Sequence, residues 1–268
     1  MDPRLYRQFC ELAHRQAGIV LKEGKESLLI ARIARRQRAL GLTSAREYLD
    51  YLEADRTGGE IVSFLDVITT NFTSFLREPE HFEHLAQEVL RWVKGGAKRL
   101  RFWSAASSTG EEPYSMALTL LEALGDAPID LRILATDLST AVLAKARDGI
   151  YDEEALEPLP ASQKLRYFER VADGDRQLYR ASEALRQVVV FKRLNLRQPP
   201  FPMRGPLDAV FCRNVMIYFD KEVRQGLVGA IEGLLKPDGF LAVGHAETLT
   251  GLQTRLRAVK PSVYARPP

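Results

Sequence analysis

Residues 100–113 read Leu-Arg-Phe-Trp-Ser-Ala-Ala-Ser-Ser-Thr-Gly-Glu-Glu-Pro, an apolar run followed by a turn of small residues and the start of a helix. Further apolar runs follow at 131–135, 207–211 and 240–243. The helices expected beside them span 81–94, 113–124 and about 222–235. Buried strands separated by helices are typical of right-handed β-α-β crossovers. The pattern therefore predicts an α/β fold with a parallel sheet covered by helices on both faces.

Residues 1–75 precede this alternation, and their apolar residues recur at helical spacing. We expect four short helices, the first ending at Gly18 and the fourth beginning after Gly58-Gly59, with Ser44 as the cap of the third. Short helices with short connections predict a small helical bundle. We therefore divide the chain into an N-terminal helical domain at 1–75 and a second domain at 76–268.

The alternation is interrupted between residues 149 and 194. Apparent strands at 178–180 and 188–191, with Asp173-Gly174 as a tight turn, predict a small antiparallel β insertion at about 165–190. Near the C-terminus, Val263-Tyr264-Ala265 is expected to form a last strand at the edge of the sheet.

Composition excludes several classes of protein. The chain has 268 residues, 46% of them hydrophobic, and a net charge of only +3, which by itself implies neither nucleic acid nor membrane. Two cysteines, Cys10 and Cys212, are too few for a disulfide framework or a cysteine metal site. His81 and His84 lie three residues apart without an apparent third ligand, so we expect no metal. The charged N-terminus and the short apolar runs predict a cytoplasmic protein that does not insert into the membrane.

The turn after the first apolar run is a candidate ligand loop, because ligands of open α/β sheets bind beyond the carboxyl ends of the strands. Of the glycines that a dinucleotide site needs, only Gly110 is present. Glu111 and Glu112 would repel a phosphate but would suit a cationic group. The alternative is an ordinary turn from strand to helix with two solvated acids.

Asp137 follows the second run, where nucleoside-binding sheets hold ribose hydroxyls. Alternatively, Asp137 or Ser139 simply caps the next helix. Taken with the preceding loop, the features favour S-adenosylmethionine over NAD. S-adenosylmethionine has a ribose for the aspartate, no phosphates, and a cationic sulfonium and ammonium for the glutamates.

Two further segments lie where a cleft is expected. Residues 71–77 join the two halves of the chain, and Arg77 could hold a carboxylate in bidentate fashion, although hydrogen-bonded turns without function are the alternative. Arg213-Asn214 ends a central strand, whereas the neighbouring Cys212 fits a small buried residue better than a nucleophile. Methyltransferases that act on base amines commonly have two prolines after an Asn at this place. This sequence has Val215 and Met216 instead, which disfavours a nucleic acid as the substrate.

The second expected helix carries a group of arginines with no acid among positions 27–40: Arg32, Arg35, Arg36 and Arg38. Such a run is usually a solvated face, but without compensating acids it could dock an acidic partner. The group lacks the interleaved aromatic rings of a base-stacking surface.

Five strings of sequence together carry a resemblance to a known family. They are Thr69–Thr73 with Arg77-Glu78, Trp103–Ser115, Phe211–Phe219, Leu235–Gly239 and Gly244-His245. In these strings the chain closely resembles the CheR family, the chemotaxis receptor glutamate O-methyltransferases. One departure is Ala246, where the family more often has Ser.

The resemblance implies an N-terminal helical domain followed by a Rossmann-like S-adenosylmethionine-dependent methyltransferase domain with a small antiparallel β insertion. It implies that the cofactor is bound by Asn71, Thr73, Arg77, Glu112, Asp137, Asn195, Leu196, Cys212 and Arg213. It also implies that Arg77 and Tyr218 line the site of methyl transfer.

The implied function is methylation of glutamate carboxylates of chemoreceptors, with glutamyl methyl ester and S-adenosylhomocysteine as products. The arginine group would then dock the Glu-rich cytoplasmic helices of the receptors, and we expect the enzyme to act as a monomer. Two alternatives stay open: a non-catalytic module that senses S-adenosylmethionine, and a nucleic-acid methyltransferase, which the strand-end motif and the modest charge disfavour.

Overall fold

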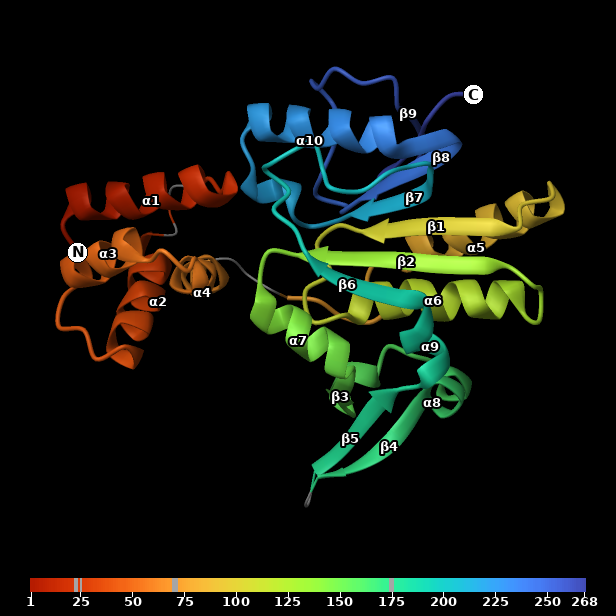
Figure 1. Cartoon of the computed structure of the whole chain (residues 1–268), viewed down its shortest axis with the longest axis horizontal. Helices are drawn as coiled ribbons and strands as arrows, with labels where there is room; N and C mark the ends of the chain where they lie inside the picture. Colours follow the sequence, from red (N-terminus) through yellow and green to blue (C-terminus); the bar gives the residue numbers. More distant parts are fainter. Residues whose placement is uncertain (22–23, 25, 69–71, 174–175) are drawn as a thin grey trace.

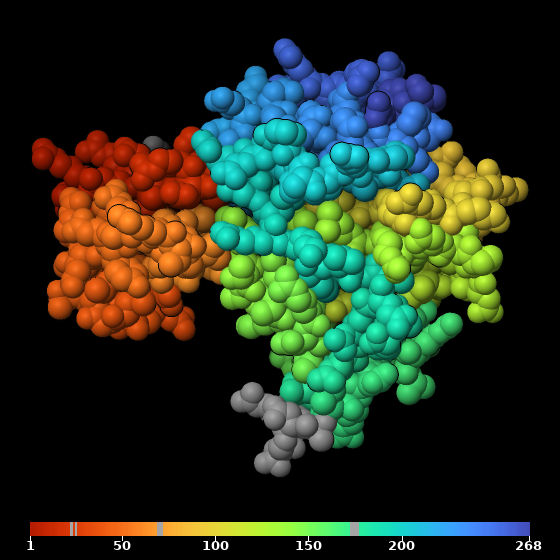
Figure 2. Space-filling model, viewed as in Figure 1, coloured from red at the N-terminus to blue at the C-terminus, as the bar shows by residue number. Residues whose placement is uncertain are grey.

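The computed structural model describes residues 1–268 with the exception of 22–23, 25, 69–71 and 174–175. A lobe of four helices stands beside a larger lobe built on a mixed sheet (Figure 1). In the space-filling view the helical lobe projects sideways from the α/β lobe (Figure 2). Among the described residues, no helix is both long enough and apolar enough to cross a membrane.

The helical lobe contains the helices that the periodicity predicts: α1 (Pro3–Ala17), α2 (Glu26–Ala39), α3 (Ala45–Ala54) and α4 (Gly59–Ile68). Gly18 ends α1 in the left-handed conformation at φ 71°, and the Ser44 side chain accepts a hydrogen bond from the Glu47 N–H. The apolar faces meet around the rings of Phe9, Tyr48 and Phe64, whose centroids lie 5.7–6.4 Å apart.

The main sheet has seven strands in the order β6-β2-β1-β7-β8-β10-β9. Its strands are β1 (Arg99–Ser104), β2 (Asp130–Asp137), β6 (Val189–Arg193), β7 (Leu207–Cys212), β8 (Leu235–Val243), β9 (Arg257–Lys260) and β10 (Val263–Ala265). The first five are parallel, as predicted for β1, β2, β7 and β8, and β10 and β9 add antiparallel pairs. Pro237-Asp238-Gly239, which has the composition of a turn, forms a bulge within β8, because Leu207 pairs with Leu235 but Ala209 pairs with Phe240.

Helices cover the two faces of this sheet unequally. The helices α5 (Glu80–Lys94), α6 (Glu111–Leu124), α7 (Thr140–Asp148) and α9 (Glu183–Val188) contribute to one large apolar core with one face of the sheet. The other face packs on α10 (Lys221–Leu234) and on the loop that contains Leu196 and Phe201. Burial on both faces explains why β7 reads as an unbroken apolar run apart from Asp208.

The small antiparallel sheet exists, but its membership corrects the sequence-based prediction. It has three strands in the order β3-β5-β4: β3 (Ile150–Asp152), β4 (Phe168–Asp173) and β5 (Arg176–Ala181), with α8 (Ala161–Tyr167) before β4. Residues 188–191 were expected here, yet β6 pairs in parallel with β2 in the main sheet. Gly174 of the predicted turn lies outside the described residues.

The strand predicted at 263–265 is present as β10, but it is not the edge of the sheet. It lies between β8 and β9, and β9 forms the edge. All residues of β9 are exposed, so its sequence shows no alternation of apolar and polar residues from which a strand could be predicted.

Candidate functional site

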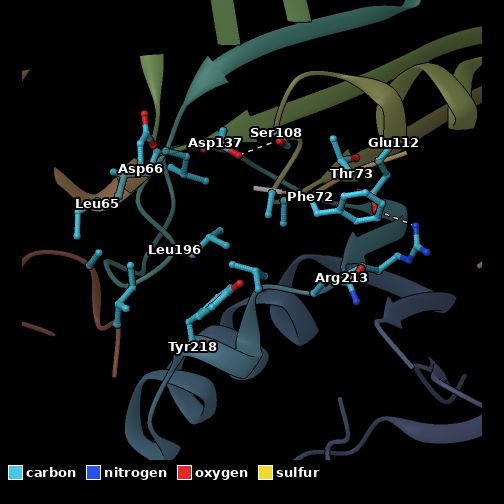
Figure 3. Close-up of a pocket in the computed structure, with 18 of the residues that line it drawn as sticks. Leu65, Asp66, Phe72, Thr73, Ser108, Glu112, Asp137, Leu196, Arg213 and Tyr218 are labelled. Atoms are coloured by element: carbon cyan, nitrogen blue, oxygen red, sulfur yellow. Dashed lines mark hydrogen bonds and ion pairs between the residues drawn. The ribbon is translucent and has the colours of Figure 1, made fainter. Parts of the chain in front are cut away.

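A pocket opens where the carboxyl ends of the parallel strands meet the helical lobe (Figure 3). Residues from both lobes line it: Ala17, Ile19, Leu65 and Asp66 from the first, Phe72–Ser74 and Arg77 from the segment that joins the lobes, and Ala105, Ala106, Ser108, Glu112, Asp137, Leu138, Leu194–Leu196, Arg213–Val215, Tyr218 and Phe219 from the second. The pocket thus gathers most residues that the sequence singled out, from segments as far apart as Thr73 and Tyr218.

Asp137 lies at the end of β2 on one side of the pocket. Its two carboxylate oxygens accept hydrogen bonds from the backbone N–H groups of Ser108, at 2.9 Å, and Ser139, at 3.0 Å. Burial raises the pKa of Asp137, and these hydrogen bonds partly offset the rise. Ser139 caps α7 through its own hydroxyl, so the capping role and the pocket position belong to different residues.

The loop between β1 and α6 needs the small residues that the sequence shows. Gly110 has φ 103°, and a Cβ there would lie 2.7 Å from the Tyr151 hydroxyl oxygen and 3.0 Å from the Ala146 Cβ. Tyr151 also donates to the carbonyl of Thr109 at 2.8 Å. The loop is therefore held tightly against the β-insertion side of the domain, with its backbone facing the pocket at Ser108.

Glu112 and Arg213 form a buried ion pair at another wall of the pocket. One Glu112 oxygen accepts from Arg213 Nη1 at 2.9 Å, and the other accepts from the Ser104 hydroxyl at 2.7 Å. Burial raises the pKa of Glu112, while the neighbouring guanidinium lowers it. A positive and a negative group side by side match the ammonium and carboxylate of a zwitterionic amino acid.

This pairing corrects the picture of two uncompensated glutamates facing a cation. Glu112 is partnered by an arginine, and Glu111 accepts hydrogen bonds from Thr109 Oγ1 and does not line the pocket. The sequence could not show the pairing because Glu112 and Arg213 lie 101 positions apart.

Arg213 is also anchored from the segment before α5. Its Nη2 donates to the Arg77 carbonyl and to a Glu78 carboxylate oxygen, the latter at 3.1 Å. Burial alone would raise the pKa of Glu78, but the Arg213 charge lowers it below the ordinary value. The rings of Phe82 and Phe211 lie 5.5 and 5.8 Å from the guanidinium carbon, so the cation is enclosed by aromatic faces.

Arg77 itself points its guanidinium along the mouth of the pocket. Nη1 donates to the Phe72 carbonyl at 2.9 Å, and the guanidinium carbon lies 5.6 Å from the centre of the Phe72 ring. Phe72 is 68% exposed, which is unusual for a phenylalanine. The pair leaves an aromatic ring and a cation accessible at the entrance.

Tyr218 lies across the pocket, in a short turn after β7. Its backbone carbonyl accepts from the Val20 N–H at 2.7 Å, and Ile19 forms a β-bridge with Phe219. Asn195 donates from Nδ2 to the Gln16 carbonyl at 2.9 Å. The segment after α1 is therefore part of the pocket wall, a contribution that no motif in these residues predicts.

The remaining predicted cofactor residues fall into three groups. Thr73 and Leu196 line the pocket with those described above. Cys212 does not line it: the thiol is fully buried, and burial raises its pKa well above the ordinary value. Asn71 lies outside the described residues.

Glu247, which follows the Gly244-His245 motif, lies behind the pocket and does not line it. Its buried carboxylate accepts from the backbone N–H groups of Gly244 at 2.6 Å, Asn214 at 2.8 Å and Ile217 at 3.1 Å. Asn214 has φ 58°, a conformation that a non-glycine residue holds only when its surroundings impose it. Glu247 thus fixes the turn that carries Arg213 and Tyr218 into the pocket.

The arginine group on α2 is less free than its sequence indicates. Glu60, buried on α4, accepts from Arg36 Nε at 2.8 Å and also from the Tyr48 hydroxyl at 2.8 Å, so Arg36 is a structural residue. Arg32 donates to the Val67 carbonyl at 3.2 Å. Arg35 and Arg38 are exposed, and they are the members of the group that a partner can reach.

His81 acquires neighbours that were not apparent in the sequence. Glu78 and His245 approach it, with one potential ligand atom of each within 4.8 Å of the others, whereas His84 packs on Phe240. Glu78 already holds the Arg213 guanidinium, and that cation opposes the binding of a second one. We therefore still expect that the cluster of Glu78, His81 and His245 binds no metal ion.

Two protein-family models match the sequence. The model described as "CheR methyltransferase, all-alpha domain" matches residues 4–69, and "CheR methyltransferase, SAM binding domain" matches residues 71–265. The chain is 44% identical over 260 residues to "Chemotaxis protein methyltransferase" of Escherichia coli, covering 97% of this chain and 90% of that protein. It is 43% identical over 260 residues to "Chemotaxis protein methyltransferase 2" of Pseudomonas aeruginosa, covering 97% and 92%.

Replacing Glu247 with Ala should loosen the turn at 213–219, because three buried N–H groups lose their acceptor. An unpaired buried donor costs about 1–3 kcal/mol, so amide hydrogen exchange in a peptide spanning these residues should accelerate about tenfold or more. Glu222→Ala, at an exposed position on α10, should leave the exchange unchanged. If mass spectrometry shows equal amide exchange in the wild type and in Glu247→Ala, the turn at 213–219 does not depend on the Glu247 carboxylate.

Proposed function

The chain belongs to the CheR methyltransferase family, and from that premise we propose that it methylates glutamate side-chain carboxylates of chemoreceptors. It is a methyltransferase, and its cofactor is S-adenosylmethionine. The proposed products are the glutamyl methyl ester and S-adenosylhomocysteine. The observation that carries the proposal is the pocket with Asp137 on one side and the Glu112–Arg213 pair on another, with Arg77 at its mouth.

The donor set of the pocket fits the cofactor. Glu112 and Arg213 would hold the ammonium and carboxylate of the methionine end, and Asp137 would accept hydrogen bonds from the ribose hydroxyls. We propose Thr73, Asn195 and Leu196 as flanking contacts, and Asn71 by its place in the motif. Cys212 can contribute only its main chain, since its thiol is buried away from the pocket.

When bound, S-adenosylmethionine supplies a methyl group on a positively charged sulfur, which an ionised carboxylate can take by direct displacement. The chain needs no general base for this reaction, because a glutamate is already ionised near neutral pH. Arg77 would orient the incoming carboxylate, and Tyr218 would hold the opposite side of the site. Positioning in a pocket from which water is excluded is then the main contribution of the protein.

We further propose that the receptor helices dock on the exposed arginines of α2. Methylation helices rich in glutamate offer the opposite charge, and Arg35 and Arg38 lie on the same lobe that completes the pocket wall. We also propose that the protein is cytoplasmic and acts as a monomer. We keep the proposed division into a helical domain at 1–75 and a methyltransferase domain at 76–268.

The reaction is tested by incubating the protein with methyl-labelled cofactor and either receptor cytoplasmic fragments or RNA. Carboxyl methyl esters release labelled methanol in mild base, whereas methylated base nitrogens keep the label. Label on the receptor fragment that is released by base, and lost when single target glutamates are changed to Ala, is the expected result. Label that stays on RNA, or no transfer at all, would favour the nucleic-acid or the sensor alternative.

Arg77→Ala should lower turnover by about 100-fold, because a misplaced reacting group costs roughly that factor. The unfolding temperature should change little, since the Arg77 guanidinium contacts the exposed Phe72 segment and not the core. Arg91→Ala, on the exposed side of α5, is the matched control. Wild-type turnover in Arg77→Ala would remove Arg77 from the active site.

Arg35→Glu with Arg38→Glu should raise KM for the receptor roughly five- to tenfold and weaken its dependence on salt, with kcat unchanged. Arg46→Glu with Arg56→Glu makes the same charge change elsewhere on the helical lobe and should leave KM near the wild-type value. If both double variants raise KM equally, overall charge and not the α2 surface guides the receptor.

Affinity for S-adenosylhomocysteine should fall as the pH is lowered through the raised pKa of the Asp137 carboxylate. The pKa of Asp137 is raised by burial, so this carboxylate takes up a proton at a higher pH than an ordinary aspartate and then accepts more weakly from the ribose. Binding is complete above the raised pKa and is lost as the pH falls through it. In Asp137→Asn, calorimetric titration should show weaker binding at neutral pH and a flatter pH dependence; an unaltered pH profile would contradict the assignment.

A further inference from the structure

A second cavity lies at the opposite end of the same strands. It has a volume of about 460 Å³ and shares no lining residue with the pocket described above. Its walls are the amino-terminal parts of β1 and β2, Val190 of β6, and the loop before β7 that contains Met203 and Arg204. On this face α10 lies beside β7 and β8 (Figure 1), the loop with Leu196 and Phe201 covers Trp103 of β1, and Val190 of β6 stays exposed.

The rim of this cavity is basic. It includes Arg99, Arg101, Arg132, Arg204 and Lys236, which we call the basic groove. Two members are neutralised, since Lys236 pairs with Asp208 and Arg101 pairs with Asp130. Arg99 is 72% exposed and reaches the same Asp130 carboxylate only at 3.9 Å.

The other two arginines are not paired with acids. Arg132 donates to the Gln187 carbonyl at 3.1 Å, and its charge acts, after that of Arg101, on the Asp130 carboxylate, whose pKa both arginines lower. Among the described residues, neither Arg132 nor Arg204 has a carboxylate within ion-pair distance. Three arginines thus present positive charge around one cavity, an arrangement that attracts a compact anion with several oxygens.

The floor of the basic groove is apolar. Leu134, Val190, Met203 and Pro206 line it, and Val190 is 43% exposed although it lies in a strand of the central sheet. An apolar floor with cations on the rim suits a flat ring system that carries phosphates. The volume falls in the range of roughly 300–1,000 Å³ that is usual for small-molecule sites.

We propose that the basic groove binds a nucleotide, with phosphates on Arg99, Arg132 and Arg204 and the base against Val190, Met203 and Pro206. Arginine forks match phosphate oxygens, and a groove of this size accommodates one small ligand better than an extended acidic polypeptide. The site is distinct from the cofactor pocket, because the two cavities lie at opposite ends of β1, β2 and β7. The inference does not depend on the proposed substrate.

The test is calorimetric titration of the intact protein with ADP and with GDP. S-adenosylhomocysteine is present at saturation so that the cofactor pocket is filled. At least one nucleotide should bind with one-to-one stoichiometry. Adenosine lacks the phosphates and pyrophosphate lacks the base, so each should bind at least about tenfold more weakly. Absence of nucleotide binding would overturn the proposal. So would pyrophosphate binding as tightly as the nucleotide, which would make the groove a site for simple anions.

Arg99→Glu with Arg204→Glu should weaken nucleotide binding by about tenfold or more, because two charge-assisted contacts become repulsive. Both side chains are exposed, so the fold should persist, and an unchanged affinity for S-adenosylhomocysteine verifies this. Arg46→Glu with Arg56→Glu is the matched control for net charge. Nucleotide affinity equal in the two double variants would place the ligand elsewhere.

Discussion

The ion pair between Glu112 and Arg213 is the interaction on which the pocket depends. It joins the start of α6 to the end of β7, and through Glu78 it also fixes the segment before α5. Removing one partner of a buried ion pair leaves an uncompensated charge at a cost of about 3–5 kcal/mol. The chain therefore cannot reach its native packing without also assembling this wall of the pocket.

The same interaction explains how far sequence could predict the site. Periodicity and capping residues such as Ser44 predicted the helices, and apolar runs predicted the central strands, because these signals are local. The charges of Glu112 and Arg213 were visible, but their pairing was not, since it depends on how distant strand ends meet. Arg36 shows the same limit: no acid is near it in sequence, and its partner Glu60 is supplied by another helix.

The sheet was mispredicted where a local pattern carries no information about its partner. Residues 188–191 read correctly as a strand, yet nothing in their composition distinguishes an insertion from the edge of the main sheet. β9 was missed because both of its faces are exposed. Glu247 could not be assigned because its partners are backbone N–H groups, which no side-chain motif reports.

Most polar contacts between the two lobes come from the first twenty residues, and α4 adds the hydrogen bond from Ser139 to Asp66 at 2.6 Å. His14 contacts Asp220 at 2.6 Å, Gln16 accepts from Asn195, and Val20 donates to the Tyr218 carbonyl. The proposed docking surface on α2 is consequently separable from the cofactor pocket, whereas α1 is not. Recombination between relatives, or design, could therefore replace α2 and α3 to change specificity. The first helix, α1, would have to stay with the α/β lobe, because it forms part of the pocket wall there.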